Sequence, residues 1–166
     1  MIAPEAYGIR LARKHRATKR QVVLRPTIAR NTSGFTRQEV MAALKVAGSK
    51  PSSSLLLDLT KTAYGYKGWC AYYPEGWVIW THKSIEYVAD CHIRLRVCNA
   101  DILPYTLRIK RGKKRVVLVS RWQALCLLLA HELGHWRQAA KDGKSRCLQI
   151  DADKNAIRVA KKLGIW

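Results

Sequence analysis

The chain has 166 residues and carries 31 Lys and Arg against 11 Asp and Glu, a formal net charge of +20. This length fits one domain with a buried core, and the charge is far above that of an ordinary soluble domain. There is no signal peptide and no apolar run of about 18 residues, so we expect an intracellular, cytoplasmic protein without a membrane span. The positive charge adds the expectation that it associates with nucleic acid or a virion. Five scattered cysteines, an odd number, favour reduced thiols over a disulfide framework.

Residues 1–33 are basic and lack hydrophobic periodicity, and we expect them to form a flexible arm before a domain over 34–166. Positive charge is concentrated in this arm and again around Gly112. Clustered cations bind DNA or RNA phosphates and release counterions, whatever the base sequence. The candidates for this binding are Arg13, Lys14, Arg16, Lys19, Arg20, Arg111, Lys113, Lys114 and Arg115.

Local signals predict a helix followed by a strand-rich region. Thr36 and Glu39 have capping-box spacing, which predicts a short helix to about Ala47, ended by Gly48. Aromatic and β-branched residues then predict strands over 69–73, 77–81, 93–97, 105–110 and 115–119, the last two joined by a turn at 111–113. The aromatic residues of this region are typical of core packing, and stacking on unpaired bases is their alternative role.

The sequence His131-Glu132-Leu133-Gly134-His135 matches the H-E-x-x-H pattern and follows the apolar run 125–130. Ser120 and Gln123 predict the start of a helix through this stretch, which ends at about Asp142. The i, i+4 spacing puts both imidazoles on one helix face, where each offers a nitrogen to one Zn²⁺. Glu132 lies about a quarter turn round, placed to accept a proton from water without ligating the metal. The pattern predicts a hydrolytic zinc site; two packed core histidines, or a decayed site, are the alternative.

At these residues the chain resembles the zincin metallopeptidases, and in particular small gluzincins of the ImmA/IrrE type from phages and prophages. Those proteins pair the H-E-x-x-H helix with a second helix that carries a carboxylate ligand, often in the pattern E-x-x-A-(D/N). The resemblance covers residues 116–163. It implies a zinc-dependent endopeptidase in which Glu132 accepts the proton of water and passes it to the leaving amine.

The order of helix, strands and two helices predicts an α+β fold. The resemblance implies the same class: a small mixed or antiparallel sheet packed against the H-E-x-x-H helix and a second C-terminal helix. It also implies that the edge strand of the sheet holds an extended protein or peptide substrate. Four residues are candidates for the group that stabilises the oxyanion, namely Tyr64, Tyr66, His82 and His92.

A catalytic zinc usually takes three protein ligands, and no histidine follows His135. Hydrophobic spacing over 148–163 predicts the second helix, which must supply the third ligand. One register of the family pattern places the ligand at Gln149 and makes Asp153 an orienting partner of a histidine. The other register makes Asp153 itself the ligand.

Helix geometry helps to choose between these registers. In a hairpin about Gly143, residues equally far from the turn face each other, which sets His135 level with Asp151 and His131 level with Asn155. Asp153 falls between these levels and borders the apolar face of the second helix. We therefore predict Asp153 as the third zinc ligand, with Asp151 as the alternative.

Two functions from different classes are compatible with these features. The first is a zinc-dependent endopeptidase that hydrolyses a protein substrate at or near nucleic acid. The second is a basic nucleic-acid-binding or phage structural protein whose metal site is structural or vestigial. The first function depends on Glu132, whereas binding of DNA or RNA by the second survives Glu132→Gln and metal removal.

Overall fold

The computed structural model describes residues 19–63, 65–73, 76–98, 105–109, 114–142 and 149–166. In these ranges the chain forms three helices, α2 (Arg37–Ala47), α3 (Arg121–Asp142) and α4 (Gln149–Lys162). The strands are β1 (Lys19–Val22), β2 (Thr27–Asn31), β3 (Leu55–Thr62), β4 (Lys67–Tyr72), β5 (Val78–His82), β6 (Ile85–Ala89), β7 (Cys91–Cys98), β8 (Tyr105–Ile109) and β9 (Lys114–Leu118). The predicted α+β class is confirmed.

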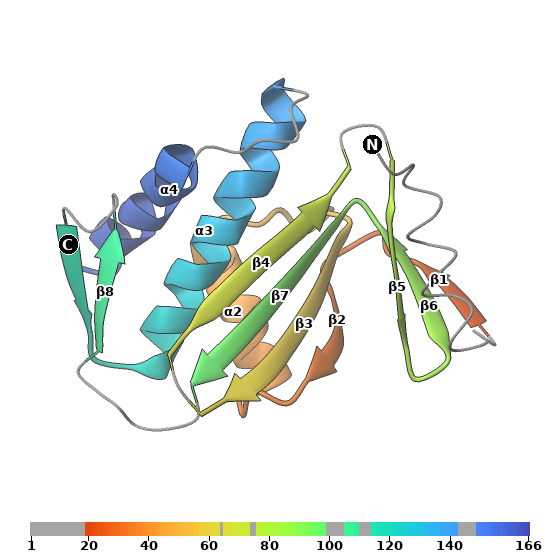
Figure 1. Cartoon of the computed structure of the whole chain (residues 1–166), viewed down its shortest axis with the longest axis horizontal. Coiled ribbons are helices and arrows are strands. Elements are labelled where there is room, and N and C mark those ends of the chain that lie inside the picture. The colour runs from red at the N-terminus through yellow and green to blue at the C-terminus, as the bar shows by residue number, and fades with distance from the viewer. Residues whose placement is uncertain (1–18, 64, 74–75, 99–104, 110–113, 143–148) are drawn as a thin grey trace.

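The main sheet is mixed and has the strand order β2-β3-β7-β4. Its first three strands run parallel, and β4 pairs antiparallel with β7 at the edge. Helices α2 and α3 lie behind this sheet in Figure 1, and α4 packs on α3. A small sheet of order β1-β6-β5 lies beside the main sheet. Strands β8 and β9 form the predicted hairpin, whose turn lies outside the described residues. None of the described helices is long and apolar enough to cross a membrane.

Strand alternation gives the main sheet two different faces. Leu57 and Leu59 of β3 and Ile93 and Leu95 of β7 point toward the helices and join the main hydrophobic cluster. The intervening residues point away from the helices, and here Leu56 packs with the small sheet in a second cluster. The main sheet is therefore covered by helices on one face and only partly covered on the other.

The structure differs from the sequence-based expectation at residues 19–33. We predicted an arm, but β1 pairs in parallel with β6, and β2 pairs in parallel with β3. Both strands are short and rich in exposed or half-buried polar residues, so they lack the hydrophobic periodicity on which the prediction relied. Their partners lie far along the chain, and this part of the arm belongs to the two sheets.

Local signals predicted the helix ends well. Thr36 caps α2 in the expected reciprocal box with Glu39, and Gly48 ends the helix with φ of 89°. At the start of α3, the Gln123 backbone N–H donates to the Ser120 hydroxyl over 3.1 Å. The Gln123 side chain accepts from the Val119 N–H rather than from that of Ser120, which modifies the predicted box. Helix α3 ends at Asp142, as expected.

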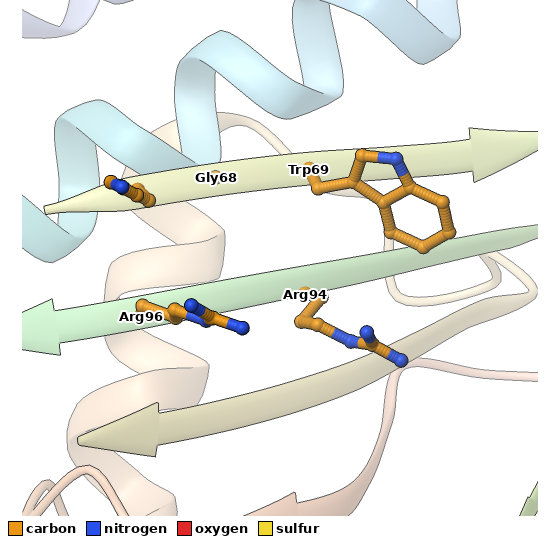
Figure 2. A pocket seen from close by; sticks show the side chains of 5 residues that line it. Gly68, Trp69, Arg94 and Arg96 are labelled. Atoms are coloured by element: carbon orange, nitrogen blue, oxygen red, sulfur yellow. The ribbon is translucent and has the colours of Figure 1, made fainter. Parts of the chain in front are cut away.

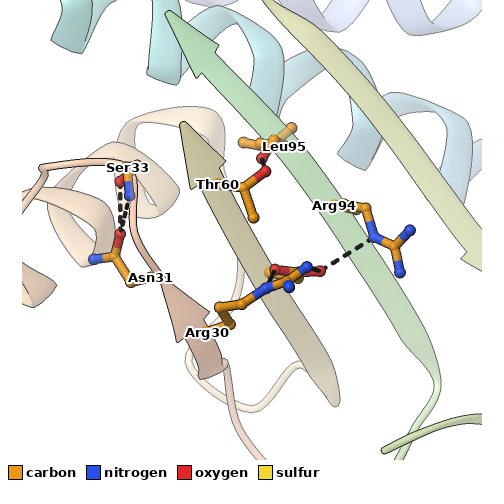
Figure 3. A network of polar contacts seen from close by, with 7 residues as sticks. Arg30, Asn31, Ser33, Thr60, Arg94 and Leu95 are labelled. Carbon is orange, nitrogen blue, oxygen red and sulfur yellow. Dashed lines mark hydrogen bonds and ion pairs between the residues drawn. The ribbon is translucent and has the colours of Figure 1, made fainter. Parts of the chain in front are cut away.

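A buried carboxylate ties together three strands of the main sheet on the face away from the helices (Figure 3). Asp58 of β3 has a fully buried side chain and accepts two hydrogen bonds of 2.6 Å from Arg30 of β2. It also accepts one of 3.1 Å from Arg94 of β7. A buried carboxylate is tolerated only when cations and hydrogen bonds compensate its lost hydration, and here two arginines do so.

Replacement of Asp58 by asparagine is expected to destabilise the fold by about 3 kcal/mol, because it leaves two arginine side chains without their shared anion. Chemical denaturation monitored by circular dichroism measures this loss. Asp90→Asn, the same change at an exposed position, is the matched control and should have little effect. Equal stability of Asp58→Asn and the unmodified protein would show that this network makes no net contribution to the free energy of unfolding.

Candidate metal centre

The two histidines of the H-E-x-x-H stretch converge on α3. Their Nε2 atoms are 3.1 Å apart, and their rings meet edge to face with centroids 4.7 Å apart. Two nitrogens bound to one tetrahedral zinc at the usual bond length lie about 3.3 Å apart. Burial, and less strongly the neighbouring His131, lowers the pKa of His135, which favours the neutral imidazole that a metal requires. This pair therefore has the separation and chemistry of two ligands to one ion.

Asp153 of α4 contacts the opposite side of the His131 ring. Its Oδ1 atom lies 3.1 Å from His131 Nδ1, and only 5% of the residue is exposed. The Nδ1 and Nε2 atoms of an imidazole point in divergent directions, so a carboxylate at Nδ1 does not reach a metal at Nε2. A carboxylate in this position fixes the ring orientation and the tautomer that leaves Nε2 available to a metal.

The close approach of α3 and α4 permits this contact. Gly134 lies against Ala152, and a Cβ at position 134 would be 2.7 Å from the Ala152 Cα atom. One turn away, the Asn155 side-chain amide donates to the Ala130 carbonyl. The first contact sets residues 134 and 152 level with each other, as in the hairpin register inferred from the sequence, and the second places Asn155 within one residue of its expected partner His131. The two small residues bring the helix backbones close enough for the short Asp153 side chain to reach His131.

We predicted Asp153 as the third ligand, and the structure sets its carboxylate beside Nδ1 of His131, where the other register put it as a partner of a histidine ring. Among the residues with described side chains, no group of three His, Cys, Asp or Glu is arranged to hold a metal ion. The side chains of Gln149 and Asp151 are outside that description. Position 149 precedes Asp153 by four residues, so it lies on the same face of α4.

Glu132 is directed toward the main sheet. It is 5% exposed, and burial raises the pKa of its carboxyl group to about 7. Its carboxylate packs on Gly68 of the edge strand β4, where a Cβ would lie 2.8 Å from Glu132 Cδ. A carboxyl group with a pKa near neutrality both accepts and returns a proton readily at physiological pH.

Gly68 was not identified from the sequence, because its role depends on a contact with a residue 64 positions further along the chain. Gly68→Ala is expected to displace the Glu132 carboxylate and to lower any hydrolytic activity by on the order of 100-fold. Rates on a quenched peptide mixture test this expectation. Lys67→Ala changes the preceding residue, which points away from Glu132, and should retain activity. Full activity of Gly68→Ala would exclude a catalytic role for this contact.

The oxyanion candidates are largely separated from Glu132. The His92 ring lies 4.9 Å from that of Trp80 and 5.9 Å from that of Trp69, on the sheet face away from α3. The His82 ring stacks on Trp80 at 5.3 Å, in the same region. Tyr66 packs against the main core cluster, and Tyr64 lies outside the described residues. The two histidines are thus on the wrong side of the sheet for that role.

Those predicted nucleic-acid-binding residues whose side chains are described do not form one surface. Lys19 and Arg20 are exposed on β1, where Arg20 pairs with Glu86 at 2.5 Å. Arg115 is exposed on β9, at the opposite end of the molecule in Figure 1. Lys114 begins β9, and its side chain is not described. The other candidates, Arg13, Lys14, Arg16, Arg111 and Lys113, lie outside the described residues.

Comparison of the chain with protein-family models, curated proteins and solved structures gave no significant match.

Proposed function

We propose that the protein is a zinc-dependent endopeptidase of gluzincin type. The observation that carries this proposal is the joint arrangement on α3: two imidazole Nε2 atoms 3.1 Å apart, beside a buried glutamate. Core histidines that merely pack have no need of a carboxylate at Nδ1 of one ring and a second buried carboxyl group next to them. Both additions are costly to bury and are expected in a hydrolytic zinc site.

In this proposal His131 and His135 would hold the zinc ion, and Asp153 would orient the His131 ring. The third ligand comes from the first turn of α4, at Gln149 or Asp151. Position 149 lies on the same face of α4 as Asp153, which favours Gln149. Asp151 has the better ligand chemistry, since zinc prefers a carboxylate to an amide. A zinc ion held there would supply Lewis-acid chemistry, polarising the scissile carbonyl and lowering the pKa of water toward neutrality.

The remaining steps belong to residues of the chain. Glu132 accepts the proton of the attacking water and donates it to the departing amine, which its pKa of about 7 allows. The substrate pairs as an extended strand with the outer edge of β4, the last strand of the described main sheet, beside Glu132. Backbone pairing gives binding without strict side-chain specificity, so the expected substrate is an extended or unfolded stretch of protein.

The first test is the metal content of the purified full chain, followed by peptide hydrolysis before and after chelation. We expect about one zinc per chain, loss of hydrolysis on chelation and recovery when zinc is returned. Folded protein that takes up no zinc when zinc is supplied would overturn the proposal. Zinc uptake without hydrolysis of any peptide would reduce the site to a structural one.

The second candidate function is a basic nucleic-acid-binding protein with a vestigial site. The observation in its favour is the contact of Asp153 with His131, because this register assigns the third ligand position to Gln149, a poor zinc ligand. Under this alternative, Glu132→Gln and chelation leave binding of DNA or RNA unchanged and there is no hydrolysis to lose.

A further inference from the structure

The face of the main sheet that points away from the helices carries a basic and aromatic hollow (Figure 2). It has a volume of about 290 Å³ and is lined by Lys67, Gly68, Trp69, Arg94 and Arg96. Lys67 pairs with Arg96 across β4 and β7, and Trp69 pairs with Arg94. Strand alternation places the side chains of these two pairs on this face of the sheet, whereas Glu132 of α3 packs against the opposite face.

The described lining of the hollow is cationic. Among the described lining residues there is no Asp or Glu, and Lys67 and Arg96 are exposed. Arg94 is held by Asp58 through its Nε atom, and its guanidinium lies over the Trp69 ring at 5.5 Å. The two cations that face solvent here would repel each other, and a bound anion removes that repulsion.

Trp69 distinguishes this surface from a simple basic patch. It is 52% exposed although it is large and apolar, and it contacts the Arg94 guanidinium and, in a T-shaped arrangement, the His92 ring. A half-exposed indole between cations has the composition of a stacking platform for bases with adjacent phosphate contacts. A duplex hides its base faces, and the carboxylate side chains of an acidic peptide offer no aromatic ring to stack. The chemistry therefore favours an unpaired strand.

We propose that Lys67, Trp69, Arg94 and Arg96 form a binding site for single-stranded nucleic acid, with a base on Trp69 and phosphates at Lys67 and Arg96. This site is separate from the zinc-binding face and does not depend on the proposed protease activity. It differs from the clusters first expected from the sequence, which lie at β1 and β9 or outside the described residues.

The test is fluorescence anisotropy of the full chain with a labelled oligothymidylate and, in parallel, with a DNA duplex of the same length. Trp69→Ala is expected to weaken binding of the single strand about tenfold and to leave binding of the duplex unchanged. Trp69→Phe, which keeps an aromatic ring, should lose less affinity for the single strand than Trp69→Ala does. Trp77→Ala is the matched control, because Trp77 is 68% exposed and does not line the hollow.

Arg96→Ala provides a second measurement that does not depend on Trp69. Removing one phosphate contact should lower the slope of log affinity against log salt by about 0.7 for the single strand. Removal of metal by chelation should leave binding of the oligonucleotide unchanged, so failure of the protease proposal leaves this test intact.

Three outcomes would overturn the site. In the first, Trp69→Ala weakens binding of the duplex as much as binding of the single strand. In the second, neither Trp69→Ala nor Arg96→Ala changes binding of the single strand. In the third, Trp69→Ala weakens binding of polyglutamate as strongly as that of the oligothymidylate, which would assign the surface to acidic peptides. If Trp69→Ala does not fold, the salt slope of Arg96→Ala decides the matter.

Discussion

Glu132→Gln is expected to lower peptide hydrolysis by about 10²- to 10⁴-fold while zinc content stays the same. Glutamine fills the same space but cannot accept a proton from water, and Glu132 has no role as a ligand in the proposed site. Initial rates on a quenched peptide mixture, with metal analysis of the same samples, measure both quantities. Glu86→Gln makes the same chemical change on β6 and should leave the rate unaltered.

Stability measurements separate this result from misfolding. Burial raises the pKa of Glu132 from 4.5 to about 7, so the folded metal-free protein holds a proton that the unfolded chain has lost in this range. The stability that this proton contributes is complete below about pH 4.5 and is lost as pH rises through 7. The free energy of unfolding of metal-free Glu132→Gln should therefore exceed that of the unmodified metal-free protein by about 3 kcal/mol above pH 7. The two free energies should converge near pH 4.5.

Two results would contradict these expectations. Undiminished hydrolysis by Glu132→Gln would remove the glutamate from the mechanism and with it the proposed function. Equal stability of the two metal-free proteins at alkaline pH would mean that Glu132 is ionised without penalty, and that its burial against Gly68 is relieved in solution.

The second large effect is expected in zinc affinity. His131→Ala and His135→Ala should each abolish binding of one zinc per chain, because each removes a ligand atom. Asp153→Asn should retain zinc with affinity reduced by about 10- to 100-fold, the usual effect of removing an orienting carboxylate. Competition with a chromogenic chelator measures these affinities. Complete loss of zinc from Asp153→Asn, in folded protein, would restore Asp153 as a ligand and contradict its observed contact with Nδ1.

Variants in the first turn of α4 identify the third ligand. If the ligand position is 149, Gln149→Glu supplies a carboxylate and should tighten zinc binding, whereas Asp151→Ala should change little. If Asp151 is the ligand, Asp151→Ala should lose zinc and Gln149→Glu should have no effect. Unchanged affinity in both variants would mean that the ligand lies elsewhere, and the register of α4 against α3 would no longer explain the site.

The helices were predicted from local signals, and these signals were sufficient. The capping residues Thr36 and Ser120 and the stop at Gly48 act within a few residues of the chain, so their effect is readable from sequence. Strand β3 was missed for the opposite reason. Its run over 55–59, four leucines and Asp58, is buried on both faces between parallel neighbours, and a fully buried strand lacks the alternation by which strands are recognised.

The candidate site was predictable in part. The spacing of His131, Glu132 and His135 fixes their relative positions on one helix, whatever the rest of the fold. The role of Asp153 depends on which ring nitrogen of His131 it meets, and that is decided by the depth at which α4 packs on α3. The Gly134 and Ala152 contact sets this depth, and it involves two small residues with no chemical signature of their own.

Strand β4 has one more consequence, which concerns communication between sites. Gly68 touches Glu132 on one side of the strand, while Lys67 and Trp69, its immediate neighbours, point to the other side. Within the described sheet, β4 is the edge strand and pairs with β7. A ligand that shifts β4 from either face therefore changes the other face, and any such effect must be reciprocal in binding free energy. The backbone of three consecutive residues would thus be sufficient to couple the two surfaces, without movement of any helix.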